Sequence, residues 1–223
     1  MKIVLFDADG TLYTAQFGYG LLKYASEHER KNRVRLYYAS LVPDILLAKL
    51  FPSAVERFQR NIIARLAWLI QGWESQETIQ AFEWIANEYL LPTARVKTLD
   101  RLKQHQAEGY RVMIVSGTFN PCLELICKQL GVTDWVGTQI EYQDGHCTGR
   151  IIPPVIKGVD KVEQVHRYFT EWTEQVDWAS SYAYGDSFSD RDMLELVGHP
   201  TAVYPDPALR SLAQDRGWEI LED

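Results

Sequence analysis

The sequence lacks a long uninterrupted apolar run, a paired-cysteine motif and an excess of positive charge. The two most apolar segments, residues 41–51 and 62–70, are interrupted by Asp44, Lys49 and Arg65, so neither is expected to span a bilayer. The N-terminal apolar stretch is too short for a signal peptide, so the expected location is cytoplasmic. The three cysteines have no Cys-x-x-Cys spacing, which favours reduced and mostly buried thiols.

The charge balance argues against another class of function. A net charge of -7 offers no general attraction to nucleic acid, so no nucleic-acid partner is expected. The hydrophobic share of 46% and the charged share of 24% are those of a folded globular protein, which excludes a disordered chain. A length of 223 residues suffices for one well-buried domain and a substantial insertion.

Short apolar runs rich in strand-forming residues recur at residues 2–7, 110–115, 181–184 and 201–204, and they predict buried strands of a parallel sheet. Helical patterns lie between them and end at glycines typical of helix C-caps. These helices are expected at residues 93–108, 119–130 and 207–216. The alternation predicts an α/β fold with a doubly wound, Rossmann-like parallel sheet.

The connection between the first two strands is too long for one crossover, since roughly 90 residues lie where a few dozen suffice. Its apolar residues recur at three- and four-residue spacings, which predicts helices at residues 17–38, 41–50, 54–70 and 76–89. We therefore expect an α/β core formed by residues 1–14 and 92–223, and a helical cap formed by residues 15–91. Asp144-Gly145 further predicts a β-hairpin over residues 139–152.

Two carboxylates, Asp7 and Asp9, follow the first expected strand directly. They would lie at the carboxyl edge of the sheet, where open α/β sheets bind ligands. An isolated Asp-x-Asp pair is more often a turn or a helix cap. The following Gly10-Thr11 favours a site, because glycine permits a sharp turn after the strand and threonine offers a hydroxyl to hold the acidic loop.

Three more motifs follow in order: Ser-Gly-Thr at residues 116–118, a lysine-bearing helix start at 158–161, and Gly-Asp-Ser-Phe-Ser-Asp at 185–190. With the Asp-Ala-Asp-Gly-Thr run, they make the whole chain resemble the haloacid dehalogenase-like (HAD) superfamily, subclass IB, phosphoserine phosphatase-like branch. The resemblance implies a phosphatase rather than a dehalogenase, because dehalogenases lack a carboxylate at the place of Asp9.

The resemblance also implies roles for the acidic residues. Asp7 corresponds to the nucleophile that forms an aspartyl-phosphate, and Asp9 to the general acid and base. Asp7, the backbone carbonyl of Asp9, and Asp186 correspond to the ligands of a magnesium ion. Asp190 would orient the metal shell, although it could equally be the N-cap of the following helix.

The remaining family positions would bind the phosphoryl group. Ser116 and the amide of Gly117 correspond to its hydrogen-bond donors. The lysine of the third motif is expected to be Lys161, one turn into a helix that begins near Gly158, while Lys157 is the alternative. A lysine in the first helical turn opposes the helix dipole, which is understandable if an anion lies nearby.

The resemblance implies a small phosphorylated metabolite as the substrate. Phosphoserine itself is less favoured, because Gln16 stands where true phosphoserine phosphatases carry a glutamate that pairs with the substrate amine. Alternatives are a phosphoserine phosphatase proper, a phosphotransferase that uses the same intermediate, or a non-catalytic binding module of the same fold. Oligomeric state is not indicated.

The expected cap is locally basic. Residues 20–70 contain nine Lys and Arg against four Asp and Glu, a net charge of +5. Solvated helix faces with intrahelical ion pairs are the simplest interpretation. Two sharper ones are that Arg57 or Arg60 binds an anionic group of the substrate, or that the cap approaches anionic lipid, although a membrane partner is not the favoured expectation.

Overall fold

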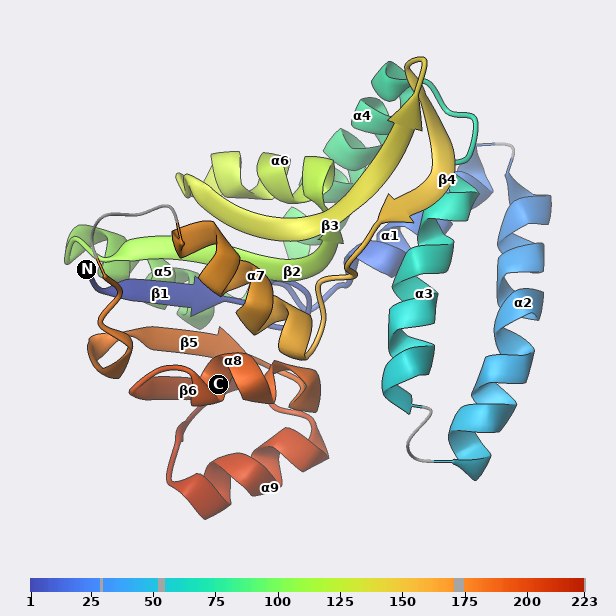
Figure 1. The fold of residues 1–223 in the computed structure, drawn as a ribbon. Helices are drawn as coiled ribbons and strands as arrows, with labels where there is room; N and C mark the ends of the chain where they lie inside the picture. The colour runs from blue at the N-terminus through green and yellow to red at the C-terminus, as the bar shows by residue number, and fades with distance from the viewer. Residues whose placement is uncertain (29, 52–54, 171–174, 223) are drawn as a thin grey trace.

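The computed structural model describes residues 1–28, 30–51, 55–170 and 175–222, without the side chains of residues 55–57. A seven-stranded sheet runs through the core in the order β4-β3-β2-β1-β5-β6-β7, and all neighbours are parallel except β3 and β4 (Figure 1). The strands are β1 Ile3–Phe6, β2 Arg111–Phe119, β3 Asp134–Gln143, β4 His146–Ile152, β5 Tyr182–Gly185, β6 His199–Val203 and β7 Glu219–Leu221.

Helices cover both faces of this sheet. They are α5 Val96–Ala107, α6 Asn120–Leu130, α7 Val159–Phe169, α8 Arg191–Glu195 and α9 Pro207–Arg216. Because successive side chains of a strand point to opposite faces, Val4 and Phe6 pack in one core cluster with Leu102 of α5. Ile3 and Leu5 pack in a second cluster with residues of α7, α8 and α9. The predicted doubly wound α/β fold is confirmed.

Two strands have weaker sequence signals than the others. β3 carries polar residues and is only partly buried, and β7 is a three-residue strand at the edge of the sheet. Neither was expected as a separate core strand. The hairpin prediction is confirmed, because β3 and β4 pair antiparallel around Asp144 and Gly145, which both have positive φ angles.

The long connection between β1 and β2 is helical, as predicted. It contains α1 Phe17–Glu27, α2 Lys31–Leu50, α3 Val55–Leu69 and α4 Ser75–Trp84, followed by a π-helical turn at Ile85–Leu90 and a 3-10 turn at Leu91–Thr93. The expected break after residue 38 is wrong. The first helix ends at Glu27, and α2 continues past Pro43. Pro43 is exposed, so water can bind the carbonyl that would otherwise accept from the missing proline amide.

The inserted helices reach the carboxyl edge of the sheet. Figure 1 shows α2 and α3 as a pair beside the sheet, with α3 running along β4. The loop before α4 pairs with that strand, since the Gly72 amide donates to the Cys147 carbonyl at 2.8 Å and the Cys147 amide donates to the Trp73 carbonyl at 2.8 Å. These bonds fix α3 beside the ends of β1 and β2.

The cysteines and the apolar helices can also be compared with what the sequence predicted. Cys122, Cys127 and Cys147 are free and buried, as predicted. Within the described part of the chain, no helix has the length and apolar character needed to cross a membrane.

Candidate active site

A cleft of about 330 Å³ opens at the carboxyl edge of the sheet, between the core and α3. Three strand ends and the start of α7 supply its floor, which contains the acidic and lysine residues singled out from the sequence. The structure thus brings together residues from all four motifs: Asp7, Asp9, Ser116, Gly117, Lys161, Asp186 and Asp190.

The loop after β1 is held in one shape by short-range contacts. Gly10 has a φ angle of +87°, and a Cβ atom at this position would overlap the Asp186 carboxylate. The Thr11 hydroxyl donates to Asp186 Oδ1 at 3.1 Å and lies 3.4 Å from Asp7 Oδ2. The loop therefore needs glycine and threonine for the reasons expected from the sequence.

Lys161 is the lysine that contacts the acidic residues. Its side chain is 3% exposed, and its Nζ donates to Asp7 Oδ1 and, at 2.6 Å, to Asp190 Oδ1. Lys157 also lines the cleft, but it is only half-buried, and the described contacts give its ammonium no carboxylate partner. Lys161 lies in the first turn of α7, where adjacent anions offset the unfavourable helix dipole.

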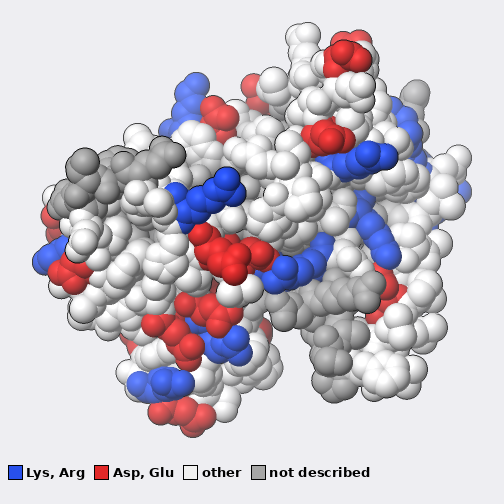
Figure 2. Space-filling model, in the orientation of Figure 1, with Lys and Arg blue, Asp and Glu red and all other residues white. Residues whose placement is uncertain are grey.

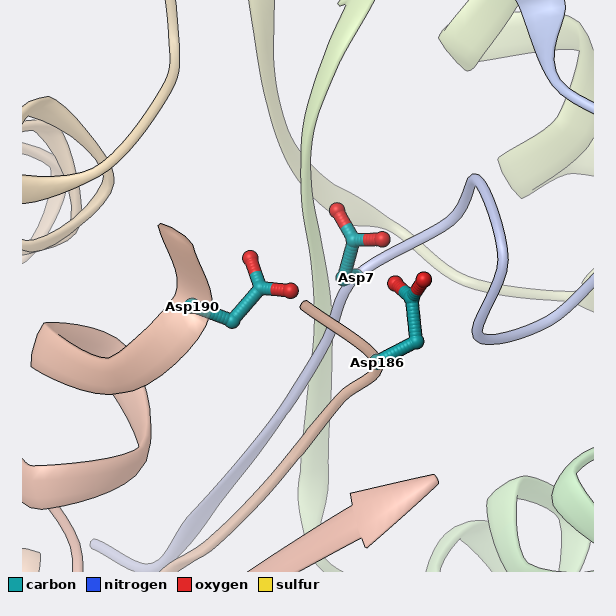
Figure 3. A group of neighbouring side chains, drawn as sticks. All are labelled: Asp7, Asp186 and Asp190. Carbon is teal, nitrogen blue, oxygen red and sulfur yellow. The ribbon is translucent and has the colours of Figure 1, made fainter. Parts of the chain in front are cut away.

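Three carboxylates converge beside this lysine. Asp7, Asp186 and Asp190 each offer an oxygen within 4.8 Å of the others, and Figure 3 shows them pointing toward one another from three segments. A hard divalent cation prefers such oxygen ligands. Asp190 also accepts from the Ser187 amide at 3.2 Å in a capping box. Asp190 therefore lies beside the carboxylate cluster, and although it also precedes α8, its side chain makes no capping hydrogen bond to that helix.

Asp9 points away from this cluster. Its Oδ1 accepts a 3.0 Å hydrogen bond from the Phe17 amide at the start of α1. Although part of Asp9 is exposed in the cleft, burial of its carboxyl raises its pKa to about 7, against the lowering effect of the Phe17 amide. A carboxyl with this pKa can hold or release a proton near neutral pH.

The other carboxyls are shifted by the same forces in different proportions. Burial raises the pKa of Asp7 to about 6, even though the Lys161 charge lowers it. Burial and the two neighbouring carboxylates raise the pKa of Asp186 to about 8. Burial would also raise the pKa of Asp190, but Lys161 and other donors hold that pKa below its usual value. Lys161 in turn has a raised pKa and stays charged.

The second motif forms the neighbouring wall. Ser116 Oγ accepts from the Thr118 amide at 3.2 Å. A Cβ atom on Gly117 would lie 2.9 Å from Ile63 Cδ1 and 3.3 Å from the Ile156 carbonyl, so α3 packs closely against this glycine. A side chain at this position would push α3 away from the cleft.

The opposite wall was not anticipated from the sequence. Gln59, Ile62, Ile63 and Leu66 of α3 line the cleft together with Gln16. Their spacing marks one helical face, but a periodic pattern does not say which face of a helix meets a site. Tertiary placement was needed to identify them.

The basic residues of α3 do not enter this wall as suggested. Arg60 forms a 2.6 Å ion pair with Asp160 at the start of α7, and it is not among the residues that line the cleft. The suggestion that Arg60 contacts the substrate therefore has no support from this arrangement. The side chain of Arg57 lies outside the described residues.

Arg95 is another residue that sequence reasoning missed. Its Nε donates to the Gly10 carbonyl at 2.8 Å, and its guanidinium lies 3.7 Å from the centre of the Tyr204 ring. Arg95 therefore braces the acidic loop from outside the cleft. No local motif marks it, because its partners are distant in the sequence.

Comparisons with known proteins identify the family of this chain. Residues 4–195 match the family model of haloacid dehalogenase-like hydrolases. The chain is 30% identical to a histidinol-phosphatase of Neisseria meningitidis serogroup C, covering 99% of this chain and 98% of that one. It is 31% identical to the phosphoserine phosphatase SerB1 of Mycobacterium tuberculosis, covering 96% and 68%.

A solved structure from Bordetella pertussis Tohama I, of a protein described as having unknown function, is similar over nearly the whole fold. It has a TM-score of 0.85 and 25% identity, covering 99% of this chain and 98% of that chain. The four ordered motifs, the converging carboxylates and the match over residues 4–195 lead to one conclusion. The chain belongs to the haloacid dehalogenase-like hydrolases, in their phosphoserine phosphatase-like branch.

Proposed function

We propose that this enzyme hydrolyses a small phosphate monoester through an aspartyl-phosphate on Asp7, with a magnesium ion. The observation that carries the proposal is the position of the Asp7 carboxylate at the floor of the cleft, between Lys161 and Asp186. One cation already faces this carboxylate, and the acidic cluster beside it suits a second.

Asp7 would act as the nucleophile. Lys161 binds Oδ1 and Thr11 lies near Oδ2, so the carboxylate is oriented before a substrate arrives. With a pKa of about 6, it is largely ionised at neutral pH. In the first step the Asp7 oxygen forms a bond to phosphorus while the ester bond breaks, and the leaving alkoxide takes a proton from Asp9.

Asp9 would serve both halves of the reaction. In the second step a water oxygen attacks phosphorus, the bond to Asp7 breaks, and Asp9 accepts the proton of that water. A pKa of about 7 suits both directions of transfer, because neither protonation state is strongly disfavoured. The Phe17 amide keeps the Asp9 carboxyl turned toward the cap side, where the leaving group would lie.

The carboxylates fit a magnesium ion, because three hard oxygen ligands converge in a buried site. Asp7, Asp186 and the backbone carbonyl of Asp9 would hold the ion, with Asp190 positioning Lys161 and the cluster. When bound, the ion supplies positive charge that offsets the repulsion between carboxylate and phosphate. Ser116 and the Gly117 amide would hydrogen-bond the transferring phosphoryl oxygens.

Residues 15–91 would form the cap, and residues 1–14 and 92–223 the catalytic core. The wall contributed by α3 and Gln16 supports this division, because these residues face the position of the leaving group. Relatives act, by their names, on phosphoserine and on histidinol phosphate. Gln16 and Gln59 are uncharged amides, so we do not favour phosphoserine.

A substitution at Gln16 tests this view of substrate choice. Gln16→Glu would place a carboxylate on the cleft wall, where it can pair with a substrate ammonium. We expect it to raise kcat/KM for phosphoserine relative to the parent enzyme, measured by phosphate release. An unchanged value would show that this residue does not face the leaving group.

The mechanism itself is tested at Asp7. We expect Asp7→Asn to abolish hydrolysis of an aryl phosphate while the fold, followed by circular dichroism, is retained. Asp100→Asn is the matched control, since Asp100 is an exposed carboxylate on α5 outside the cleft. The same assay with and without magnesium tests the metal. Retained turnover in Asp7→Asn would refute the mechanism.

A further inference from the structure

Apart from the side that packs against the protein, α2 exposes a large set of apolar side chains. Leu50 is 71% exposed and Leu46 is 56% exposed, and six other residues on the same helix and its end are similarly open. We call this set the α2 surface: Leu36, Tyr38, Val42, Ile45, Leu46, Leu47, Leu50 and Phe51. So many exposed large apolar side chains on one helix are unusual for a soluble monomer without a partner.

The helix is attached to the rest of the protein along its other side. Tyr37 and Leu41 are its buried residues, and Asp44 pairs with Arg65 of α3 at 2.6 Å. These contacts leave the α2 surface facing outward. Figure 1 shows α2 as the outermost helix of the pair, farthest from the sheet.

The charge around the α2 surface is positive. Lys31, Arg35 and Lys49 lie on α2, and its one acidic residue, Asp44, is already paired with Arg65. Residues 20–70 carry a net charge of +5 within a chain of -7, so the remainder carries -12. Figure 2 shows acidic side chains gathered over the core in this view.

Exposed apolar side chains together with positive charge favour one of two possible partners, a second copy of this chain or an anionic lipid surface. Two copies joined through α2 would bring basic residues against basic residues and offer no acidic partner from this helix. An anionic phospholipid surface provides negative charge for the lysines and arginines and an apolar layer for the leucines and the phenylalanine. The acidic core would face the water.

We propose that α2 is a docking helix for the surface of an anionic phospholipid bilayer. Leu46, Leu50 and Phe51 insert at the boundary between head groups and acyl chains, while Lys31 and Lys49 contact lipid phosphates. This inference does not depend on the substrate or on the chemistry of Asp7.

Flotation of the full chain with vesicles tests the proposal. We expect binding to vesicles of equimolar phosphatidylcholine and phosphatidylglycerol, weak binding to phosphatidylcholine alone, and release as salt rises from about 0.05 M to about 0.5 M. Lys49→Ala should weaken binding about fivefold. The double variant Leu46→Glu/Leu50→Glu should weaken it at least about tenfold.

Val96→Glu is the matched control, because Val96 is 70% exposed on α5, outside the α2 surface. It should bind anionic vesicles like the parent chain. Aryl phosphate hydrolysis should be unchanged in all these variants, which shows that they fold. Absence of binding to anionic vesicles overturns the proposal. So does a dimer, seen by light scattering, that Leu46→Glu/Leu50→Glu dissociates while vesicle binding persists.

Discussion

Lys161→Met offers a sharp test of the active-site geometry, with Lys157→Met as its control. Methionine keeps an unbranched apolar stem but removes the ammonium that contacts Asp7 and Asp190. Both lysines line the same cleft, only Gly158, Val159 and Asp160 separate them in the chain, and only Lys161 is buried against carboxylates. The pair of variants therefore separates the loss of a specific ion pair from the general loss of one positive charge.

The expected effect on stability is large. Lys161 and Asp190 are 3% and 2% exposed, so solvent does not screen their interaction. Removing one partner of such a buried pair costs about 3–5 kcal/mol. For a chain of this size, that corresponds to a fall in Tm of roughly 6–20 °C. Lys157→Met should stay within about 0.5 kcal/mol of the parent, as for most partly exposed side chains.

The loss should also depend on pH. Lys161 has a raised pKa in the folded state and is charged throughout the neutral range, so its contribution is present there. Without it, Asp7 and Asp190 repel each other when ionised, and protonation relieves that repulsion. The deficit of Lys161→Met should therefore be larger near pH 8 than near pH 5, measured by thermal unfolding without metal.

Activity provides the second readout. We expect Lys161→Met to lower kcat/KM for an aryl phosphate by about 10²–10³, as when a donor to a developing charge is lost. Lys157→Met should have a much smaller effect. If Lys157→Met abolishes turnover while Lys161→Met retains both activity and Tm, the assignment of the third-motif lysine is wrong.

Two other predictions follow from the acidic loop and the carboxylate pKa values. Gly10→Ala should abolish magnesium-dependent activity, because the added Cβ atom would displace the Asp186 carboxylate. Gly109→Ala is the control: Gly109 also has a positive φ angle but open space around it, so this variant should only lower Tm. Equal activity in both variants would contradict the prediction. Raised folded pKa values of Asp9 and Asp186 mean that metal-free stability falls as pH rises from about 4 to about 8. Magnesium, which binds the ionised carboxylates, should therefore raise Tm more near pH 8 than near pH 5, and an equal shift at both would refute the idea.

Short-range pattern was enough to find the core of this protein. A continuous apolar run such as Ile3–Phe6 predicts a strand of a parallel sheet without any other information, because such strands are buried on both faces. Glycines such as Gly131 and Gly217 end helices because they adopt left-handed backbone conformations. The edge strand β7 and the first half of β3 were not predicted, because partly exposed strands carry polar residues and resemble loops.

The breaks between the inserted helices were harder to place. Apolar spacing predicted a break between residues 38 and 41, yet α2 runs without interruption through this region and past Pro43. Pro43 is exposed, so water can bind the carbonyl that the missing amide leaves free. Local propensity is a weak guide wherever solvent or tertiary packing can compensate for it.

The sequence by itself determined the order of the four motifs and the identity of the carboxylates, since each motif is a short local run of residues. Lys161 was favoured over Lys157 from the sequence, and the tertiary structure shows that it is Lys161 that contacts them. Asp7 and Lys161 are 154 positions apart, and their contact arises only when β1 and α7 come together at one edge of the sheet. The α3 wall, the brace from Arg95 and the open face of α2 are likewise products of packing, because a helical pattern states which residues share a face but not what that face meets.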